Sequence, residues 1–152
     1  MKIDIKNVDI KKVDIKKVET EEEINKIYQL REQVFVGEQG VPFEIERDSA
    51  DQKAIHIIAQ YDNQSVGCGR IVFYQDTAKI GRLAVVKEYR GQGIGKALCS
   101  ELINIATLKG YEQIILHAQL GSRGFYEKQG FQTSGDVFEE AGIKHIKMIF
   151  SL

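Results

Sequence analysis

Apolar residues recur at intervals of three and four positions in two long segments of the chain, which predicts two amphipathic helices. The first helix should cover residues 21–36, because Thr20 and Glu23 form a capping box at its start. The second should cover residues 93–109 and end at Gly110. Shorter apolar runs between turn residues predict strands. They lie at 54–61, 66–74, 79–86, 113–118, 131–133 and 144–150, with a short helix at 122–129.

This order of elements predicts the fold class. The three consecutive strands within 54–86 should pair antiparallel through turns at 62–65 and 75–76. We therefore expect an α/β fold with a single mixed, mostly antiparallel central sheet flanked by helices. A chain of 152 residues has the length of one domain, residues 1–152. The acidic segment at 44–51 has weak periodicity and is expected to form a loop or a short helix.

A five-residue repeat, DIKNV, DIKKV and DIKKV, occupies positions 4–18. Its period fits neither a strand nor a helix. We expect the last copy to supply a first strand, while the earlier copies either extend that strand or remain a solvated arm. Residues 1–13 are therefore treated as an N-terminal extension that contains the repeat, and the sequence assigns it no function.

The composition excludes several classes of partner. A formal net charge of -1 gives no broad attraction for nucleic acid or for an anionic membrane. The charged first residues and the absence of a long apolar run predict a cytoplasmic protein without membrane association. Cys68 and Cys99 lack a CxxC spacing and are expected to be reduced, buried thiols, with no disulfide and no metal.

Three glycines lie within five residues where a predicted strand runs into the second long helix, in the segment R-G-Q-G-I-G at 90–95. Glycine-rich backbone at a helix start can direct several amides at one anion. The dinucleotide-binding pattern GxGxxG fails because Lys96 stands at the third glycine position. The P-loop pattern fails because Ala97, not Ser or Thr, follows Lys96.

The same six residues match the [QR]xxGx[GA] pattern of the GNAT-type N-acetyltransferases, which bind the pyrophosphate of acetyl-coenzyme A at this junction. The strand at 79–86 also resembles the family's cofactor-facing strand. LHAQ at 116–119 and FYEKQGF at 125–131 resemble the next strand and the family's FYEKxGF segment. The segments VFVGEQ at 34–39 and EAGIKH at 140–145, together with Asp48, Asp51, Ala54 and His56, are similar to a less well defined bacterial branch of the superfamily, whose acceptors the sequence does not identify.

The resemblance implies acetyl-CoA as the acyl donor and a set of residues that hold it. Main-chain groups of the strand would pair with the pantetheine arm, and one amide of this strand would bind the thioester oxygen. The glycine-rich amides would meet the pyrophosphate, with charge from Arg90 or Lys96. Gln119 stands where many members carry an asparagine that contacts the cofactor. The implied donor-binding residues are Leu83, Ala84, Val85, Arg90, Gly91, Gln92, Gly93, Ile94, Gly95, Lys96, Gln119 and Tyr126.

The resemblance also implies catalytic residues. Tyr126 matches the tyrosine that protonates the departing thiolate. An amine of pKa about 10.4 needs a base to become neutral, and His117, His56, Glu38 or Glu44 could serve. The acidic residues at 44, 46, 48 and 51 could recognise a cationic acceptor or could simply form a solvated loop.

The sequence therefore predicts an N-acetyltransferase that moves an acetyl group from acetyl-CoA to a primary amine of a small molecule or protein. A non-catalytic module that binds acyl-CoA is the alternative. An interaction domain without a ligand is a third hypothesis. A monomer or a homodimer is expected, and no metal is required.

Overall fold

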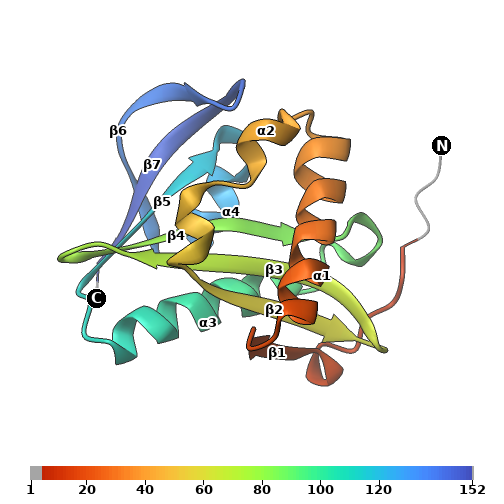
Figure 1. The fold of residues 1–152 in the computed structure, drawn as a ribbon. Coiled ribbons are helices and arrows are strands. Elements are labelled where there is room, and N and C mark those ends of the chain that lie inside the picture. Colours follow the sequence, from red (N-terminus) through yellow and green to blue (C-terminus); the bar gives the residue numbers. More distant parts are fainter. Residues whose placement is uncertain (1–4, 152) are drawn as a thin grey trace.

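Seven strands form one sheet in the order β1-β2-β3-β4-β5-β7-β6 (Figure 1). The computed structural model describes residues 5–151, so residues 1–4 and 152, including the first residue of the repeat, lie outside it. All neighbouring strands are antiparallel except the parallel pair β4 and β5. The predicted fold class is confirmed. The strands are β1 (Asp14–Lys17), β2 (Ile55–Tyr61), β3 (Gln64–Phe73), β4 (Thr77–Val85), β5 (Gln113–Gln119), β6 (Phe131–Glu140) and β7 (Ile143–Ser151).

The helices lie close to where the hydrophobic periodicity places them. They are α1 (Glu21–Arg31), α2 (Phe43–Glu46), α3 (Ile94–Leu108) and α4 (Arg123–Lys128). The capping box of Thr20 and Glu23 is formed at the start of α1. The helical path after α1 continues beyond the predicted end as a π-helical segment, Glu32–Glu38. Segments of this kind often occur at functional sites. This one leads into the loop at 39–42, which precedes α2.

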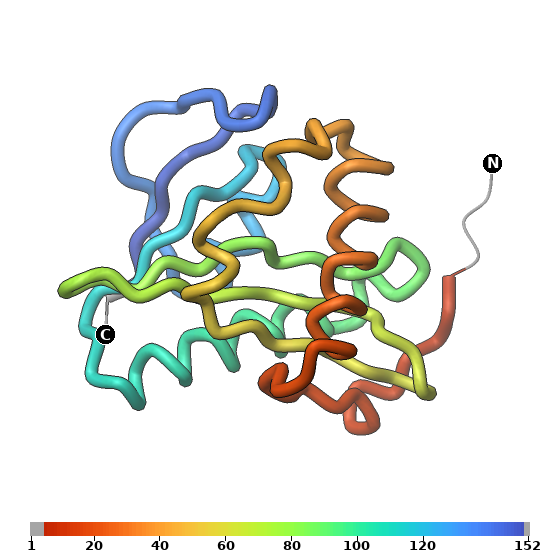
Figure 2. The backbone as a smooth tube through the Cα atoms, viewed as in Figure 1, coloured from red at the N-terminus to blue at the C-terminus, as the bar shows by residue number. Residues whose placement is uncertain are grey.

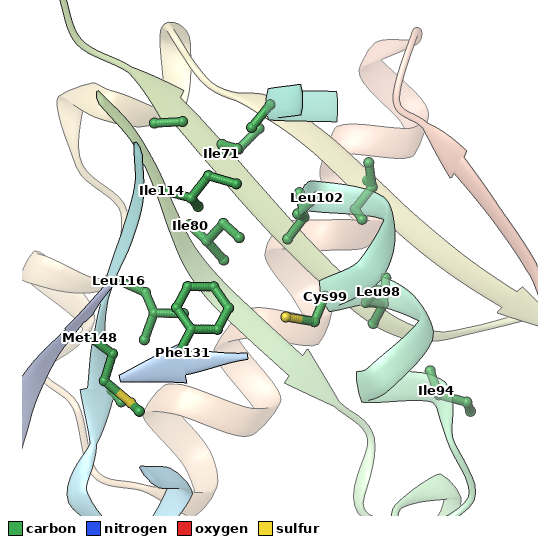
Figure 3. Packing of buried hydrophobic residues seen from close by; sticks show 14 of the residues in the cluster. Ile71, Ile80, Ile94, Leu98, Cys99, Leu102, Ile114, Leu116, Phe131 and Met148 are labelled. Atoms are coloured by element: carbon green, nitrogen blue, oxygen red, sulfur yellow. The ribbon is translucent and has the colours of Figure 1, made fainter. Parts of the chain in front are cut away.

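Two apolar clusters hold the helices on opposite faces of the sheet. On one face, α3 packs Leu98 and Leu102 against buried side chains of β4 and β5, such as Ile80 and Ile114 (Figure 3). On the other face, α1 packs with Ile58, Cys68 and Ala84 of the central strands. Figure 1 shows α1 and α3 on these two sides. The core therefore fixes β4 from both faces.

The C-terminal hairpin is longer than predicted. The prediction ended the first of its strands at 133, but β6 continues to Glu140 and turns at Ala141–Gly142 into β7. Residues 134–140 contain glycine and several polar residues, which resemble a loop. They form a strand because β6 is at the edge of the sheet, where one face is solvated and a bulge is tolerated at Gly135, whose φ is +84°.

The first copies of the repeat form an arm that packs against the body of the protein. The last copy supplies β1, as predicted, and pairs with β2. Residues 5–13 neither extend this strand nor stay free of the protein. The amide of Lys6 donates to the carbonyl of Glu88 at 2.8 Å, and Val8 and Val13 pack on the main apolar cluster. Figure 2 shows the arm running beside the loop that joins β4 to α3.

None of the helices within residues 5–151 is both long enough and apolar enough to cross a membrane.

Candidate active site

A cavity opens where β4 and β5 stop pairing. The two strands pair only over Thr77–Ile80 and Gln113–Leu116 and then separate. Beyond Ile80, the edge of β4 that faces β5 is left without a strand partner. The cavity has a volume of about 660 Å³, which suits a small ligand. Its walls come from the separated strands, the π-helical segment, α2, α4 and the β6–β7 hairpin.

Seven of the donor-binding and catalytic residues predicted from the sequence line this cavity. They are Leu83, Ala84, Val85, Arg90, His117, Gln119 and Tyr126. The six residues from Gly91 to Lys96 do not line it and follow directly after Arg90, at the start of α3. The cavity and the glycine-rich junction are therefore adjacent along the chain.

Backbone strain is stored in the cavity wall at Arg82. The strand carries a bulge opposite Gly69, and Arg82 takes a φ of +51°, which costs a non-glycine residue of order 1 kcal/mol or more. Its guanidinium donates from Nε to Glu46 Oε2 at 3.0 Å and from Nη2 to the Glu46 carbonyl at 2.9 Å. These bonds hold the bulge and thus the edge of β4 in place.

Arg82 belongs to a larger buried network under α2. Arg31 is fully buried and donates to Glu46 at 2.9 Å and to Asp51 at 2.7 Å. Arg70 donates from Nη1 to Asp48 and to Asp51, both at 2.7 Å. The cluster of three arginines and three carboxylates is electrically balanced and hydrogen-bonded. It joins α1 and the α2 region to β3 and β4.

Asp51 lies at the centre of this network. Burial by itself would raise the pKa of its carboxyl, but the hydrogen bonds and charges of Arg31 and Arg70 outweigh burial and lower it to about 2. Asp51 and Glu46 are therefore neither part of a solvated loop nor free to bind a cationic acceptor. One signal of this network is visible in the sequence, since Arg31 falls within the apolar stripe of the first helix.

The glycine-rich junction presents unpaired amides. Gly91 and Gly93 have φ values of +76° and +97°, and Gly93 is the N-cap of α3 without a side-chain cap. The first intrahelical bond runs from Ala97 N to Gly93 O, so the amides of the three residues before Ala97 have no intrahelical acceptor. Such a helix start fits a phosphate group, with the helix dipole adding to the attraction.

Several predicted donor-binding side chains contact other parts of the protein. Arg90 donates from Nε to the Val85 carbonyl at 2.8 Å and from Nη2 to Glu38 at 3.0 Å. Gln92 is bound by the N-terminal arm, which leaves only its main chain to face the junction. Gln119 donates to Gln39 at 2.7 Å and so links β5 to the loop after the π-helical segment.

Tyr126 lies half-buried in the cavity wall. Its ring packs edge-to-face against Phe125 and Phe131, with centroids 5.0 and 5.9 Å away. Burial raises the pKa of its phenol well above the ordinary value. The hydroxyl is therefore protonated at neutral pH and can act as a proton donor.

His117 lies in another wall of the cavity. Its Nδ1 is 3.1 Å from Glu140 Oε1, and His145 Nε2 is 3.7 Å from the other oxygen of the same carboxylate. Burial by itself would raise the pKa of the Glu140 carboxyl. The hydrogen bond and charge of His117 have the larger, opposite effect, so the pKa lies below its ordinary value. An ionised Glu140 orients His117 through Nδ1. The sequence assigned Glu140 no role in the site, because this residue lies beyond the predicted end of the first strand of the hairpin.

The other candidate bases lie elsewhere. His56 is buried outside the cavity lining, its Nε2 is 2.9 Å from the Asp51 carbonyl, and burial lowers its pKa. Glu38 forms an ion pair with Arg90, and Glu44 does not line the cavity. Only His117 among the four candidates lines the cavity. Within residues 5–151 no group of three His, Cys, Asp or Glu side chains could hold a metal ion.

Comparisons with known proteins agree with this arrangement. The family model of the acetyltransferase (GNAT) domain matches residues 15–152. The Bacillus subtilis protein YyaT is 38% identical over 132 residues, which cover 85% of this chain and 89% of YyaT. A crystal structure of an acyl-CoA N-acyltransferase from Pseudomonas aeruginosa is 28% identical and superposes with a TM-score of 0.83, covering 91% of this chain and 99% of that one.

A more distant structure shares the fold. A GNAT family acetyltransferase from Elizabethkingia anophelis, solved with acetyl-CoA bound, is 21% identical, with a TM-score of 0.72 over 93% of this chain and 99% of that one. The family match spans the sheet, both long helices and the whole cavity. This chain therefore belongs to the GNAT family of acetyltransferases.

Proposed function

We propose that this protein transfers an acetyl group from acetyl-CoA to a primary amine of a small molecule or protein. The observation that carries the proposal is the continuous path from the unpaired edge of β4, past Arg90, to the unpaired amides at the start of α3. An extended chain with a phosphate group at one end matches this path, since one part offers strand-like main-chain groups and the other offers anion-binding amides.

The residues divide into those that hold the donor and those that move protons. Main-chain groups of Leu83, Ala84 and Val85 bind the pantetheine arm, and one amide of this edge donates to the thioester oxygen. The amides from Gly91 to Lys96 bind the pyrophosphate. Acetyl-CoA, when bound, supplies the acetyl thioester, whose acetyl group becomes bonded to the amine nitrogen while CoA leaves as the thiol.

Two side chains complete the proton balance. His117 accepts the proton of the ammonium at Nε2, because its Nδ1 is engaged by Glu140. After the attack the nitrogen loses its second proton to solvent, while Tyr126 donates its hydroxyl proton to the departing sulfur and later regains one from solvent. Since a phenol is a weaker acid than a thiol, the protonated state of Tyr126 is kept until the sulfur carries negative charge. Arg82 and its carboxylate partners keep the β4 edge in place during the reaction.

The test is release of free CoA in the presence of acetyl-CoA and a panel of primary amines. We expect Tyr126→Phe to lower kcat by about 100-fold, in the range of general acid catalysis, while the Kd of acetyl-CoA stays within twofold. Tyr111→Phe, which alters a tyrosine outside the cavity, is the matched control. If acetyl-CoA binds but no amine is acetylated, the protein is an acyl-CoA-binding module and not an enzyme.

A further inference from the structure

The half of the cavity away from the glycine-rich junction contains one cation, Lys79, that forms no ion pair with any residue from 5 to 151. Lys79 lies on β4 between Val72 of β3 and Ile115 of β5, and it lines the cavity. Burial lowers the pKa of its ammonium, which indicates that protein replaces much of its water. Among residues 5–151 it forms no salt bridge. An ammonium in this position gains from an anion that enters the cavity.

The neighbouring carboxylates are engaged by other groups. Glu140 and Asp48 are the two acids that raise the pKa of Lys79 by charge. Glu140 pairs with His117, and Asp48 pairs with Arg70 and Arg82. The arginine and carboxylate network is itself balanced. Lys79 is therefore the cation in this part of the cavity that no residue within 5–151 holds in an ion pair, while the nearby acids are bound by other side chains.

The position of Lys79 relative to His117 suggests what the anion is. Lys79 pairs in register with Ile115, two residues before His117 on β5, and both side chains line the same cavity. Successive residues on one face of a strand are about 7 Å apart, so the side chains of Lys79 and His117 can both reach one small molecule that lies between them. An amine at His117 would thus place a carboxylate of the same molecule within reach of Lys79.

We infer that the acceptor is a primary amine that also bears a carboxylate, such as an amino acid or a small amino-acid derivative, and that Lys79 binds the carboxylate. This inference rests on the proposed acetyl transfer. A cationic acceptor without an anionic group is disfavoured, because it would add charge beside Lys79 while the acids of the α2 region are already paired.

The experiment compares matched acceptors: leucine with isopentylamine, phenylalanine with phenethylamine, and lysine with cadaverine. Acetyl-CoA is the donor, and kcat/KM is measured from CoA release. We expect the carboxylate-bearing member of at least one pair to be preferred by about 10- to 100-fold, the range for a charged hydrogen bond. Lys79→Met should abolish the preference through KM, and Lys79→Arg should retain most of it.

The controls separate this inference from the proposed function. Lys53→Met removes an exposed lysine outside the cavity and should leave the preference unchanged. Acetyl-CoA should bind Lys79→Met and the unaltered protein equally. Equal or faster acetylation of the amines without a carboxylate would overturn the inference and leave acetyl transfer intact. Acetyl-CoA binding without acetylation of any acceptor would overturn both.

The N-terminal arm carries a second, independent inference. Its main chain holds the side-chain amide of Gln92, with Val8 N donating to Oε1 at 2.8 Å and Nε2 donating to the Lys6 carbonyl at 2.6 Å. The tip of Ile10 lies over Gly93, since a Cβ built on Gly93 would be 3.5 Å from Ile10 Cδ1. The matched family domain begins at residue 15, so residues 5–13 lie before it.

The arm is in turn fixed to the sheet by Tyr61. The Tyr61 hydroxyl accepts from Asp9 N at 3.1 Å and donates to the Asn7 carbonyl at 3.5 Å. The loop from Glu88 to Gly93 is thereby tied to a segment that lies before the matched family domain. We propose that the repeat arm is a positioning element that preorganises the glycine-rich junction for the pyrophosphate.

This second proposal is tested by Gln92→Ala and Tyr61→Phe, with Tyr111→Phe as the control. We expect both variants to raise the Kd of acetyl-CoA about three- to tenfold, as for loss of one or two hydrogen bonds, with kcat at saturation within twofold. Hydrogen exchange of the amides at 88–93 should become faster in both. Faster exchange with an unchanged Kd would overturn the proposal and show that the arm only packs on the surface.

Discussion

Replacing Asp51 by asparagine tests the buried network that supports the cavity wall. Asparagine has nearly the same shape, but it removes the negative charge and replaces one of the two oxygens that accept from Arg31, Arg70 and the Asp48 amide with an NH2 donor. The carboxyl pKa falls from an ordinary value of 3.8 to about 2 in the folded protein. By linkage, this shift corresponds to a contribution of about 2 kcal/mol to the free energy of unfolding at pH 7. We expect Asp51→Asn to lose at least that amount, because lost hydrogen bonds add to the lost charge.

The pH dependence gives the sharper result. Because the folded-state pKa lies below the unfolded one, the contribution is complete above about pH 5 and is lost as the pH falls through about 2. The difference between Asp51→Asn and the unaltered protein should therefore be about 1 kcal/mol smaller at pH 3 than at pH 7. The assay is urea unfolding followed by circular dichroism at pH 7 and pH 3. The melting temperature at pH 7 should fall by about 4 to 8 °C.

The control is Asp136→Asn, which changes an exposed aspartate on β6 and should move the free energy of unfolding by less than about 0.5 kcal/mol. A loss for Asp51→Asn that is the same at both pH values would refute the reasoning, since the effect would then come from packing and not from charge. An unchanged stability at pH 7 would refute it as well.

Two further predictions concern the core. Gly130→Ala should destabilise the protein by about 2 to 4 kcal/mol in urea unfolding, because its φ is +103° and a Cβ would lie 2.7 Å from Phe150 Cε2. Gly124→Ala, in a helix with open space, should be neutral or stabilising, and an equal loss in both would contradict this account. Burial raises the thiol pKa of both Cys68 and Cys99 to about 12, so neither should react with an aromatic disulfide reagent until urea unfolds the protein. Rapid reaction in the folded state would contradict their burial.

Much of the fold could be predicted because it depends on local patterns. The two long helices follow from apolar spacing and from Thr20 and Gly110 at their ends, and most strands follow from short apolar runs. The edge strand β6 could not, because a half-solvated strand with a bulge needs no apolar run and resembles a loop. Glu140, the partner of His117, lies in the part of β6 that the sequence did not predict as a strand.

The site was predictable to the extent that it is local in sequence. The glycine-rich junction is one continuous segment, so its motif could be found directly. The network of Arg31, Arg70 and Arg82 with the acidic segment joins residues up to 36 positions apart in the sequence. No local sequence pattern indicates which arginine pairs with which carboxylate. The same holds for Gln92, whose partners lie more than 80 residues earlier in the arm.

The central claim is that the glycine-rich junction binds the phosphates of acetyl-CoA, and thermal unfolding with and without the ligand tests it most directly. At a hundred times its Kd, acetyl-CoA should add about 2.7 kcal/mol, which raises the melting temperature by roughly 5 to 10 °C for a chain of this size. Gly93→Asp should lose this shift, because it places a carboxylate at the start of α3, whereas the uncharged Gly93→Asn should retain part of it. No shift in the unaltered protein at any concentration, or the same shift in Gly93→Asp, would contradict the claim.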